Sequence, residues 1–214
     1  MEKDYLILTN QKTKKKLVFY PVAKNANTSV KIFLVKHLGL EKKFYYLEDE
    51  IPRYKLTNEI LQKYEDRYNI INFLPAYTKF KKVSVDEKAC VVRDPLDRFI
   101  SAYKNRILFH KDHSFSNHSI DEVIEKLENN LFENKHFLPQ TYWLGNDLNY
   151  FTIKANIKKL DSFISSINNF FSKQIEFPKM QIGGNKFNRS LNIEQKLKIK
   201  KIYSSDYDLV SNYI

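Results

Sequence analysis

Two short segments of the chain combine residue types that could bind phosphate. In the first, residues 21–30 (PVAKNANTSV), Lys24 stands four and five residues ahead of the hydroxyls of Thr28 and Ser29. If a helix begins here, its free backbone N–H groups, the two hydroxyls and the lysine would converge on one anion. The glycines and the lysine-before-hydroxyl order of a Walker A loop are absent. An ordinary helix start would explain the same residues equally well.

The second segment, residues 91–103 (VVRDPLDRFISAY), carries more information. Arg93 follows an apolar run with the composition of a strand, and Ser101 comes eight residues later. On a helix that spacing is about two turns, so the serine returns to the side on which the helix starts. An arginine fork and a hydroxyl could therefore bind one phosphate together.

Three further charged residues of this segment have competing explanations. Asp94 and Asp97 suit the N-terminus of a helix, where carboxylates cap free N–H groups and interact favourably with the helix dipole. We therefore expect both to be structural rather than catalytic. Arg98 could contact a nucleotide, or it could form a salt bridge within the fold.

Both segments need a strand, a loop and a helix in that order. Residues 17–22 (LVFYPV) form a run typical of a strand, and apolar residues at helical spacing then continue to Gly39, which suits a helix C-terminus. Residues 89–92 (ACVV) predict a buried strand. Pro95 suits the first turn of the helix that follows, because its missing N–H would be unpaired there.

The other predicted elements alternate in the same way. Residues 70–74 and 150–153 predict two more strands. Helices are predicted over residues 41–68, from Ser119 through Leu127, over 160–171, and from Asn192 to the C-terminus. This alternation indicates an α/β fold, a three-layer sandwich with a central parallel sheet. In such folds ligands bind at the carboxyl ends of the strands, where both segments would lie.

Composition limits the domain count and the kind of site. The 214 residues are 43% hydrophobic, enough for one sizeable core, and no linker divides them, so we expect a single domain over residues 1–214. Cys90 is the only cysteine, and the five histidines lack ligand spacing, so neither an intrachain disulfide nor a metal site is expected. The first sixteen residues hold only a short apolar patch, which predicts no signal peptide or membrane span and a cytoplasmic protein.

The net charge of +11 would attract polyanions such as nucleic acid, anionic glycans, phospholipid headgroups or a multiply charged nucleotide. The charge alone does not choose among them. The densest basic run, residues 12–16 (KTKKK), precedes the first predicted strand. It is either a solvated strand entry or the rim of an active site.

Taken together, the two segments resemble the signatures with which sulfotransferases bind 3′-phosphoadenosine 5′-phosphosulfate (PAPS). Residues 21–30 are similar to the element that binds the 5′-phosphosulfate, and residues 91–103 to the element that binds the 3′-phosphate. The closer resemblance is to carbohydrate sulfotransferases of the chondroitin and HNK-1 type. Residues 134–141 (NKHFLPQT) and 202–213 (IYSSDYDLVSNY) are similar to that family's HWxPQ and Y-x-x-D-[FY] elements, in the same order.

The chain departs from that family in two ways. Animal members carry an N-terminal membrane anchor and paired cysteines, which this sequence lacks, so Golgi residence is not implied. Pro21 also stands two residues further from Lys24 than in the family's usual Pro-Lys pair.

The resemblance implies a P-loop-like sulfotransferase fold and transfer of a sulfuryl group from PAPS to a hydroxyl, with 3′,5′-adenosine bisphosphate (PAP) as product and without a metal. It implies that Lys24 is catalytic, offsetting the charge that grows on the bridging oxygen. The donor would be bound by Lys24, Asn25, Ala26, Asn27, Thr28, Ser29, Arg93, Ser101, Asn188 and Ser190.

The acceptor hydroxyl also needs a general base, for which a histidine suits neutral pH. His136 lies in a matched element and is our candidate catalytic base, although a structural role would also explain it. Alternatives with less support are His37, His110, His113, His118, Glu65 and Glu133.

The resemblance implies a carbohydrate or glycoconjugate acceptor, and a lipid-linked sugar, a peptide tyrosine or a small metabolite would also fit a basic cleft. A nucleic-acid-binding protein is the main alternative, favoured by the net charge and by lysines beside aromatic residues at 42–46 (KKFYY). It leaves the four ordered motifs unexplained, so no nucleic acid is expected. A nucleotide-dependent kinase of P-loop-like fold is a third hypothesis. No feature of the sequence indicates an oligomeric state.

Overall fold

A four-stranded sheet forms the centre of the computed structural model, which describes residues 6–39, 79–111, 117–178 and 191–213. Its strands, in spatial as well as chain order, are β1 (Leu6–Thr9), β2 (Lys16–Tyr20), β3 (Glu87–Val92) and β4 (Ile153–Asn156). β2, β3 and β4 are parallel, and β1 pairs with β2 as an antiparallel edge. The carboxyl ends of β2 and β3 therefore lie at the same edge of the sheet.

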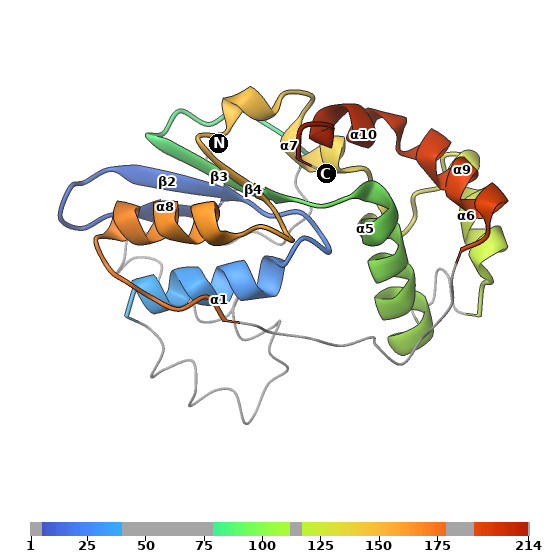
Figure 1. Cartoon of the computed structure of the whole chain (residues 1–214), viewed down its shortest axis with the longest axis horizontal. Helices are drawn as coiled ribbons and strands as arrows, with labels where there is room; N and C mark the ends of the chain where they lie inside the picture. Colours follow the sequence, from blue (N-terminus) through green and yellow to red (C-terminus); the bar gives the residue numbers. More distant parts are fainter. Residues whose placement is uncertain (1–5, 40–78, 112–116, 179–190, 214) are drawn as a thin grey trace.

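Helices cover both faces of this sheet, because the central strands are apolar on both sides. One face packs against α1 (Asn27–His37) and α8 (Asp161–Phe171). The other packs against α7 (Gln140–Leu144) and α10 (Ser204–Val210). Figure 1 shows α1 and α8 below the sheet and α7 and α10 above it. The expected α/β sandwich with three layers and a mostly parallel sheet is confirmed.

A third group of helices packs beyond the end of the sheet (Figure 1). It consists of α5 (Pro95–Ala102), the π-helix η1 (Tyr103–Phe109), α6 (Ile120–Glu128), the short 3₁₀ helix η2 (Lys135–Phe137) and α9 (Ile193–Ile202). Their shared core includes Phe99, Tyr103, Val123, Ile199 and Tyr203. α5 begins at the carboxyl end of β3, so it links this group to the edge of the sheet where ligands are expected.

Several predicted helix boundaries are confirmed, because they depend on neighbouring residues. Pro95 occupies the first turn of α5, and Gly39 has φ 72° just after α1 ends. Ser119 and Asn192 begin α6 and α9 with full capping boxes. The predictions over residues 41–68 and 70–74 lie outside the described residues. The prediction of a single domain stays a prediction.

The strand predicted over residues 150–153 is wrong by three residues. Residues Leu148–Tyr150 form a 3₁₀ helix, η3, and β4 begins at Ile153. The Asp147 side chain accepts the N–H of Asn149 at 2.8 Å and so starts this turn. The Tyr150 hydroxyl donates to the Val83 carbonyl at 2.9 Å, which holds the tyrosine outside the sheet.

The basic run at residues 12–16 lies in and just after the turn that joins β1 to β2, and its side chains are exposed. This turn precedes β2, whereas residues 21–26 follow it. A five-residue strand spans about 16 Å, so the lysines lie far from the edge at which α1 begins. Their place is that of a solvated strand entry. No helix among the described residues is long and apolar enough to cross a membrane.

Candidate active site

The loop between β2 and α1 has a backbone suited to an anion. Lys24 and Ala26 have φ of 71° and 56°, a left-handed conformation that is uncommon outside glycine, and Asn25 between them does not. The Asn25 N–H donates to the Val22 carbonyl at 3.2 Å, so these residues form a tight turn directly before α1. Ala26 occupies the N-cap position of α1 and offers no capping side chain, and the first turn holds no acidic residue. The start of α1 is therefore open to a negatively charged group.

Cations from two segments gather beside this loop. The Arg93 guanidinium donates from Nη1 to the Lys24 carbonyl at 3.0 Å, so the two predicted phosphate-binding segments lie side by side. Burial, together with the positive charges of Arg106, Arg93 and Arg98, lowers the pKa of Lys24 to about 8. A lysine surrounded by arginines is costly to protonate, and a bound anion would remove that cost.

Three buried polar atoms at this edge have no hydrogen-bond partner within the described part of the chain. They are Nε of Arg93 and the side-chain oxygens of Asn25 and Asn27. Buried polar groups are nearly always paired, so unpaired atoms clustered in two neighbouring loops call for an explanation. A ligand that both accepts and donates hydrogen bonds, as a nucleotide phosphate and its sugar or base do, would satisfy them.

Gln140 at the start of α7 joins the two loops and was missed by the sequence reasoning. Its side chain donates to the Arg93 carbonyl at 2.8 Å and accepts the Arg93 N–H at 3.1 Å. The same oxygen accepts from the Asn25 amide at 2.7 Å, and that amide also donates to the Val91 carbonyl at 2.8 Å. These two bonds of its amide nitrogen fix the Asn25 side chain within the loop. The signal for Gln140 was its position in the quoted PQ element.

The Asp206 side chain in α10 holds the backbone of Gln140 in place. Its carboxylate is fully buried and accepts the N–H of Gln140 at 2.7 Å and that of Thr141 at 2.9 Å. In the same helical group, the Tyr203 hydroxyl donates to the Phe137 carbonyl at 2.6 Å. Tyr203 and Asp206 are the two fixed positions of the quoted Y-x-x-D element. Their side chains hydrogen-bond to the backbone of the segment that contains the PQ element, which is a structural role.

Arg98 has a structural place, which it takes through backbone carbonyls and not through the salt bridge considered above. Only 1% of it is exposed; its Nε donates to the Ala23 carbonyl at 3.0 Å and its Nη2 to the His136 carbonyl at 3.1 Å. The guanidinium lies 5.0 Å from the ring centre of Trp143. Burial lowers the pKa of Arg98, and the Asp206 charge opposes that shift. Arg98 thereby fixes the first loop against the segment that carries His136.

The start of α5 is closed by its own carboxylates, as expected. The Asp94 side chain accepts the Asp97 N–H at 2.9 Å, and Asp97 forms a 2.6 Å ion pair with Lys158. Ser101 lies further along α5 and is half-buried. Because it is two residues beyond Phe99, it points about 200° away from it around the helix.

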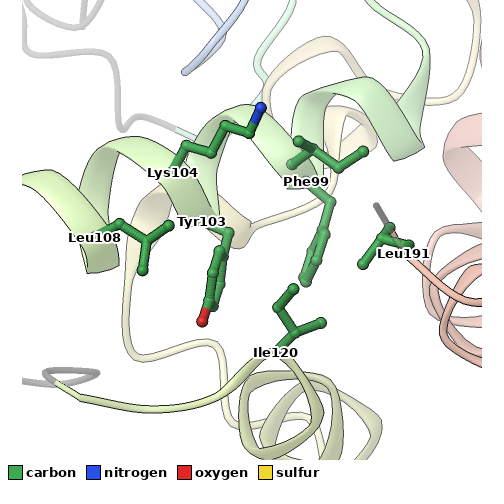
Figure 2. Close-up of a pocket in the computed structure, with 7 residues that line it drawn as sticks. Phe99, Tyr103, Lys104, Leu108, Ile120 and Leu191 are labelled. Atoms are coloured by element: carbon green, nitrogen blue, oxygen red, sulfur yellow. The ribbon is translucent and has the colours of Figure 1, made fainter. Parts of the chain in front are cut away.

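Figure 2 shows a separate, mainly apolar pocket on the Phe99 side of this helix. Its labelled lining residues are Phe99, Tyr103, Lys104, Leu108, Ile120 and Leu191. Ser101 and Arg93 do not line it. The pocket therefore lies apart from the loop that carries Lys24, and its apolar lining does not suit a phosphate.

His136 lies in η2, where it can keep one ring nitrogen unprotonated. Its Nδ1 lies 3.0 Å from the Asn134 side-chain oxygen, which also accepts the His136 N–H at 3.0 Å. An amide oxygen only accepts, so Nδ1 carries the proton and Nε2 is the basic nitrogen of the neutral ring. The Arg98 guanidinium donates to the carbonyls of both His136 and Ala23, so the backbone of His136 lies close to the residue before Lys24.

The other histidines are placed less well for proton transfer. His37 lies at the far end of α1, about 15 Å from its start, and packs between the rings of Phe33 and Phe171. Burial, together with the charge of Lys173, lowers its pKa to about 4. His110 is exposed at the end of η1. His113, Glu65, Asn188 and Ser190 lie outside the described residues.

Two of the remaining predicted donor-binding residues, Thr28 and Ser29, occupy the first turn of α1, where Ser29 is 6% exposed. Arg106 is a cation of the site that the sequence reasoning missed, since nothing but its basic type distinguished it. The described residues contain no group of three or more metal-ligating side chains.

Comparison with known proteins identifies the family. The model of the sulfotransferase family matches residues 9–210, which include both loops of the site, the element at residues 134–141 and the first nine residues of the element at 202–213. Searches of the curated proteins and of the solved structures each gave no significant match. A family match of this extent, on a mixed α/β fold in which the two predicted phosphate-binding segments meet, supports a sulfotransferase activity. The chain belongs to the sulfotransferase family.

Proposed function

We propose that the protein transfers a sulfuryl group from PAPS to a hydroxyl of a carbohydrate acceptor. The observation that carries this proposal is the contact between the two loops, in which Arg93 donates to the carbonyl of Lys24 beside the uncapped start of α1. One loop offers backbone N–H groups and a lysine, and the other offers an arginine. PAPS has two separate anionic groups, a 5′-phosphosulfate and a 3′-phosphate, and so needs two such places.

In this proposal the start of α1 binds the 5′-phosphosulfate. Its first-turn N–H groups and the hydroxyls of Thr28 and Ser29 surround the point at which the dipole favours negative charge. Arg93, with its unpaired Nε, and Ser101 bind the 3′-phosphate. Asn27, whose side-chain oxygen is also unpaired, can accept a hydrogen bond from the donor.

The transfer exchanges one S–O bond for another. The acceptor oxygen bonds to sulfur, the bond from sulfur to the bridging oxygen breaks, and its electron pair stays on that oxygen as PAP leaves. Lys24 offsets the charge that grows there. With a pKa of about 8, Lys24 is mostly protonated at neutral pH but can donate its proton more readily than an ordinary lysine.

His136 takes the proton of the acceptor hydroxyl in this mechanism. The contact with Asn134 supports the role, because it directs the ring proton to Nδ1 and leaves the lone pair on Nε2. Arg98 supports it as well, by holding the backbone of His136 close to the lysine loop.

A carbohydrate acceptor is supported by the resemblance to chondroitin and HNK-1 sulfotransferases and by the net charge of +11, which suits an acidic glycan.

Calorimetric titration with PAP tests the donor site. Removing Arg93 (Arg93→Ala) should weaken PAP binding by about 2 to 3 kcal/mol, or roughly 30- to 150-fold, because a charge-assisted phosphate contact is lost. Lys198→Ala is the matched control: it removes one positive charge from α9, where Lys198 pairs with Glu194. It should leave PAP affinity within about twofold, since an exposed distant charge is screened.

Two results would contradict the proposal. If the wild-type protein does not bind PAP, the donor assignment fails. If Arg93→Ala, with an unchanged circular dichroism spectrum, binds PAP as the wild type does, the second loop is not part of the donor site.

A further inference from the structure

The outer face of α9 carries two large apolar side chains in an otherwise basic helix. Ile193 and Leu197 are 78% and 62% exposed. They are four residues apart, so they lie one turn from each other on the same face of the helix. The inner face is marked by Ile199, which is fully buried in the third group of helices, and by Gln195, which donates to Asp121 of α6 at 2.9 Å. The apolar pair therefore faces away from the protein.

Three exposed lysines border this apolar pair. At about 100° per residue, Lys200 and Lys196 lie about 20° and 60° around the helix from Ile193. Lys201 lies about 40° from Leu197, on the other side of the pair. We call these five residues the α9 surface.

The remaining charges of α9 leave this surface positive. Lys198 forms an ion pair with Glu194 at 2.9 Å, so these two charges offset each other. The α9 surface itself contains three lysines and no carboxylate. A single exposed apolar residue is ordinary, whereas two on one turn, bordered by lysines, are typical of helices that lie on membranes.

An anionic lipid surface fits both the apolar and the basic part of this pattern. Apolar side chains of an interfacial helix enter the boundary between headgroups and acyl chains, and the apolar stems of lysines let their ammonium groups reach the headgroups. Each lysine close to such a surface strengthens binding about fivefold. The net charge of +11 attracts the whole protein to the same surface.

Other partners fit the α9 surface less well. Nucleic acid would pair with the lysines but would leave Ile193 and Leu197 without an apolar partner. A second copy of the chain would cover the apolar pair, yet it would bring the lysines of two α9 surfaces together, and like charges repel. A peptide helix binds in an apolar groove, whereas the α9 surface is the exposed side of one helix.

We propose that the α9 surface docks the protein on a membrane that contains anionic phospholipids. α9 has ten residues and is about 15 Å long, too short to cross ~30 Å of hydrocarbon, so it lies in the plane of the interface. Ile193 and Leu197 enter the lipid, and the three lysines contact the headgroups. This docking uses no residue assigned to the donor site, so it does not depend on the proposed function.

Sedimentation with lipid vesicles tests the docking. The full chain should bind vesicles of phosphatidylcholine with about one third phosphatidylserine at least about tenfold more tightly than vesicles of phosphatidylcholine alone. Replacing both apolar side chains, Ile193→Ser with Leu197→Ser, should weaken binding to the anionic vesicles about tenfold. Because both residues are exposed, folding should be preserved, and a circular dichroism spectrum checks this.

Two triple variants separate the α9 surface from a general attraction of charge. Each replaces three exposed lysines with glutamine, so both have the same net charge. The variant of the three α9 lysines should bind anionic vesicles about 100-fold more weakly than the wild type. The control combines Lys12→Gln, Lys14→Gln and Lys15→Gln in the turn between β1 and β2, at the other end of the molecule (Figure 1), and should bind within about threefold of the wild type.

An indole placed on the α9 surface reports the contact directly. Trp143 is the only tryptophan of the chain and is 2% exposed, so its emission should not respond to vesicles. In Leu197→Trp, the added emission should shift to shorter wavelength when anionic vesicles are present, because the indole leaves water for the interface.

Each other outcome has a definite meaning. The proposal is overturned if the wild type does not bind anionic vesicles, if Ile193→Ser with Leu197→Ser binds as the wild type does, if both triple variants lose affinity equally, or if vesicle-bound Leu197→Trp shows no shift. A dimer in analytical ultracentrifugation that Leu197→Ser dissociates would assign the surface to a second copy instead. Failure of the wild type to bind PAP would reject the proposed function and would not affect the docking.

Discussion

α1 and α5 follow neighbouring parallel strands and begin at the same edge of the sheet, yet their N-termini are built in opposite ways. The N-cap of α1 is Ala26, which has no capping side chain, and the first turn of α1 holds no acidic residue. The N-cap of α5 is Asp94, whose side chain caps the helix, and Asp97 adds a second carboxylate.

In the proposed function this difference separates two ways to bind phosphate. The start of α5 is capped by its own carboxylates, so an anion nearby would depend on the side chain of Arg93. The start of α1 has neither a capping side chain nor a carboxylate, which leaves its dipole and the arginines around Lys24 to a ligand. The proposal thus assigns a backbone site to one loop and a side-chain site to the other, and only the first should be sensitive to changes of helix capping.

The largest change in PAP affinity is expected when α1 receives a carboxylate at its N-cap, as α5 has. Ala26→Asp places a negative charge at the N-cap of α1, and PAP affinity should fall by on the order of 2 kcal/mol, or about 30-fold, because of charge repulsion in a partly buried site. Calorimetry measures the change. Folding should be preserved, since aspartate tolerates the left-handed φ of 56° better than alanine.

Ala26→Asn is the matched control for shape, because it differs from Ala26→Asp in charge alone. It should bind PAP within about threefold of the wild type. An equal loss in both variants would mean that bulk, and not charge, closes the loop.

The next effect is on pH dependence. The pKa of Lys24 is lowered to about 8, and an anion prefers the protonated lysine. PAP affinity should therefore be near its maximum at pH 7 and should fall about tenfold between pH 7 and pH 9, as the protonated fraction drops from about 0.9 to about 0.1.

Lys24→Met should remove this dependence and leave a weaker, flat profile. The comparison is needed because burial also lowers the pKa of Lys31 in α1 to about 8. If the slope survives in Lys24→Met, another group such as Lys31 causes it.

The smallest effect is expected at the start of α5. Asp94→Ala removes a cap and should lower the free energy of unfolding by about 1 kcal/mol in urea denaturation, with PAP affinity unchanged or slightly improved, since a carboxylate beside Arg93 is lost. Ser119→Ala removes the comparable cap of α6, far from both loops, and should destabilise by a similar amount. A large loss of PAP affinity in Asp94→Ala alone would break the contrast between the two helices.

The sequence predicted the features that depend on close neighbours. Pro95 with Asp94 specifies the start of α5, and Ser119 with Glu122 specifies that of α6, because cap and partner are at most three residues apart. The two strand-loop-helix units that end in α1 and α5 were predicted for the same reason, because each lies within one short segment.

Features set by distant contacts were not predicted. Gln140 bonds to residues 47 and 115 positions away, and no local pattern encodes such pairs. Tyr150 lies in a run that favours a strand, but its hydroxyl bonds to Val83 and holds it in a turn. The π-helix that carries Arg106 has the apolar spacing of an α-helix, so no residue type announced the change of pitch.

The dependence of Gln140 on Asp206 also bears on the order in which the protein can fold. Asp206 lies in α10, which follows both loops in the chain, and it fixes Gln140, which joins these loops. Contacts that span 66 residues bear the entropy cost of closing a long loop before they stabilise the fold. During synthesis the loops near residues 24 and 93 would leave the ribosome well before Asp206 does. The edge of the sheet that carries both loops should accordingly be the last part of the described structure to become rigid.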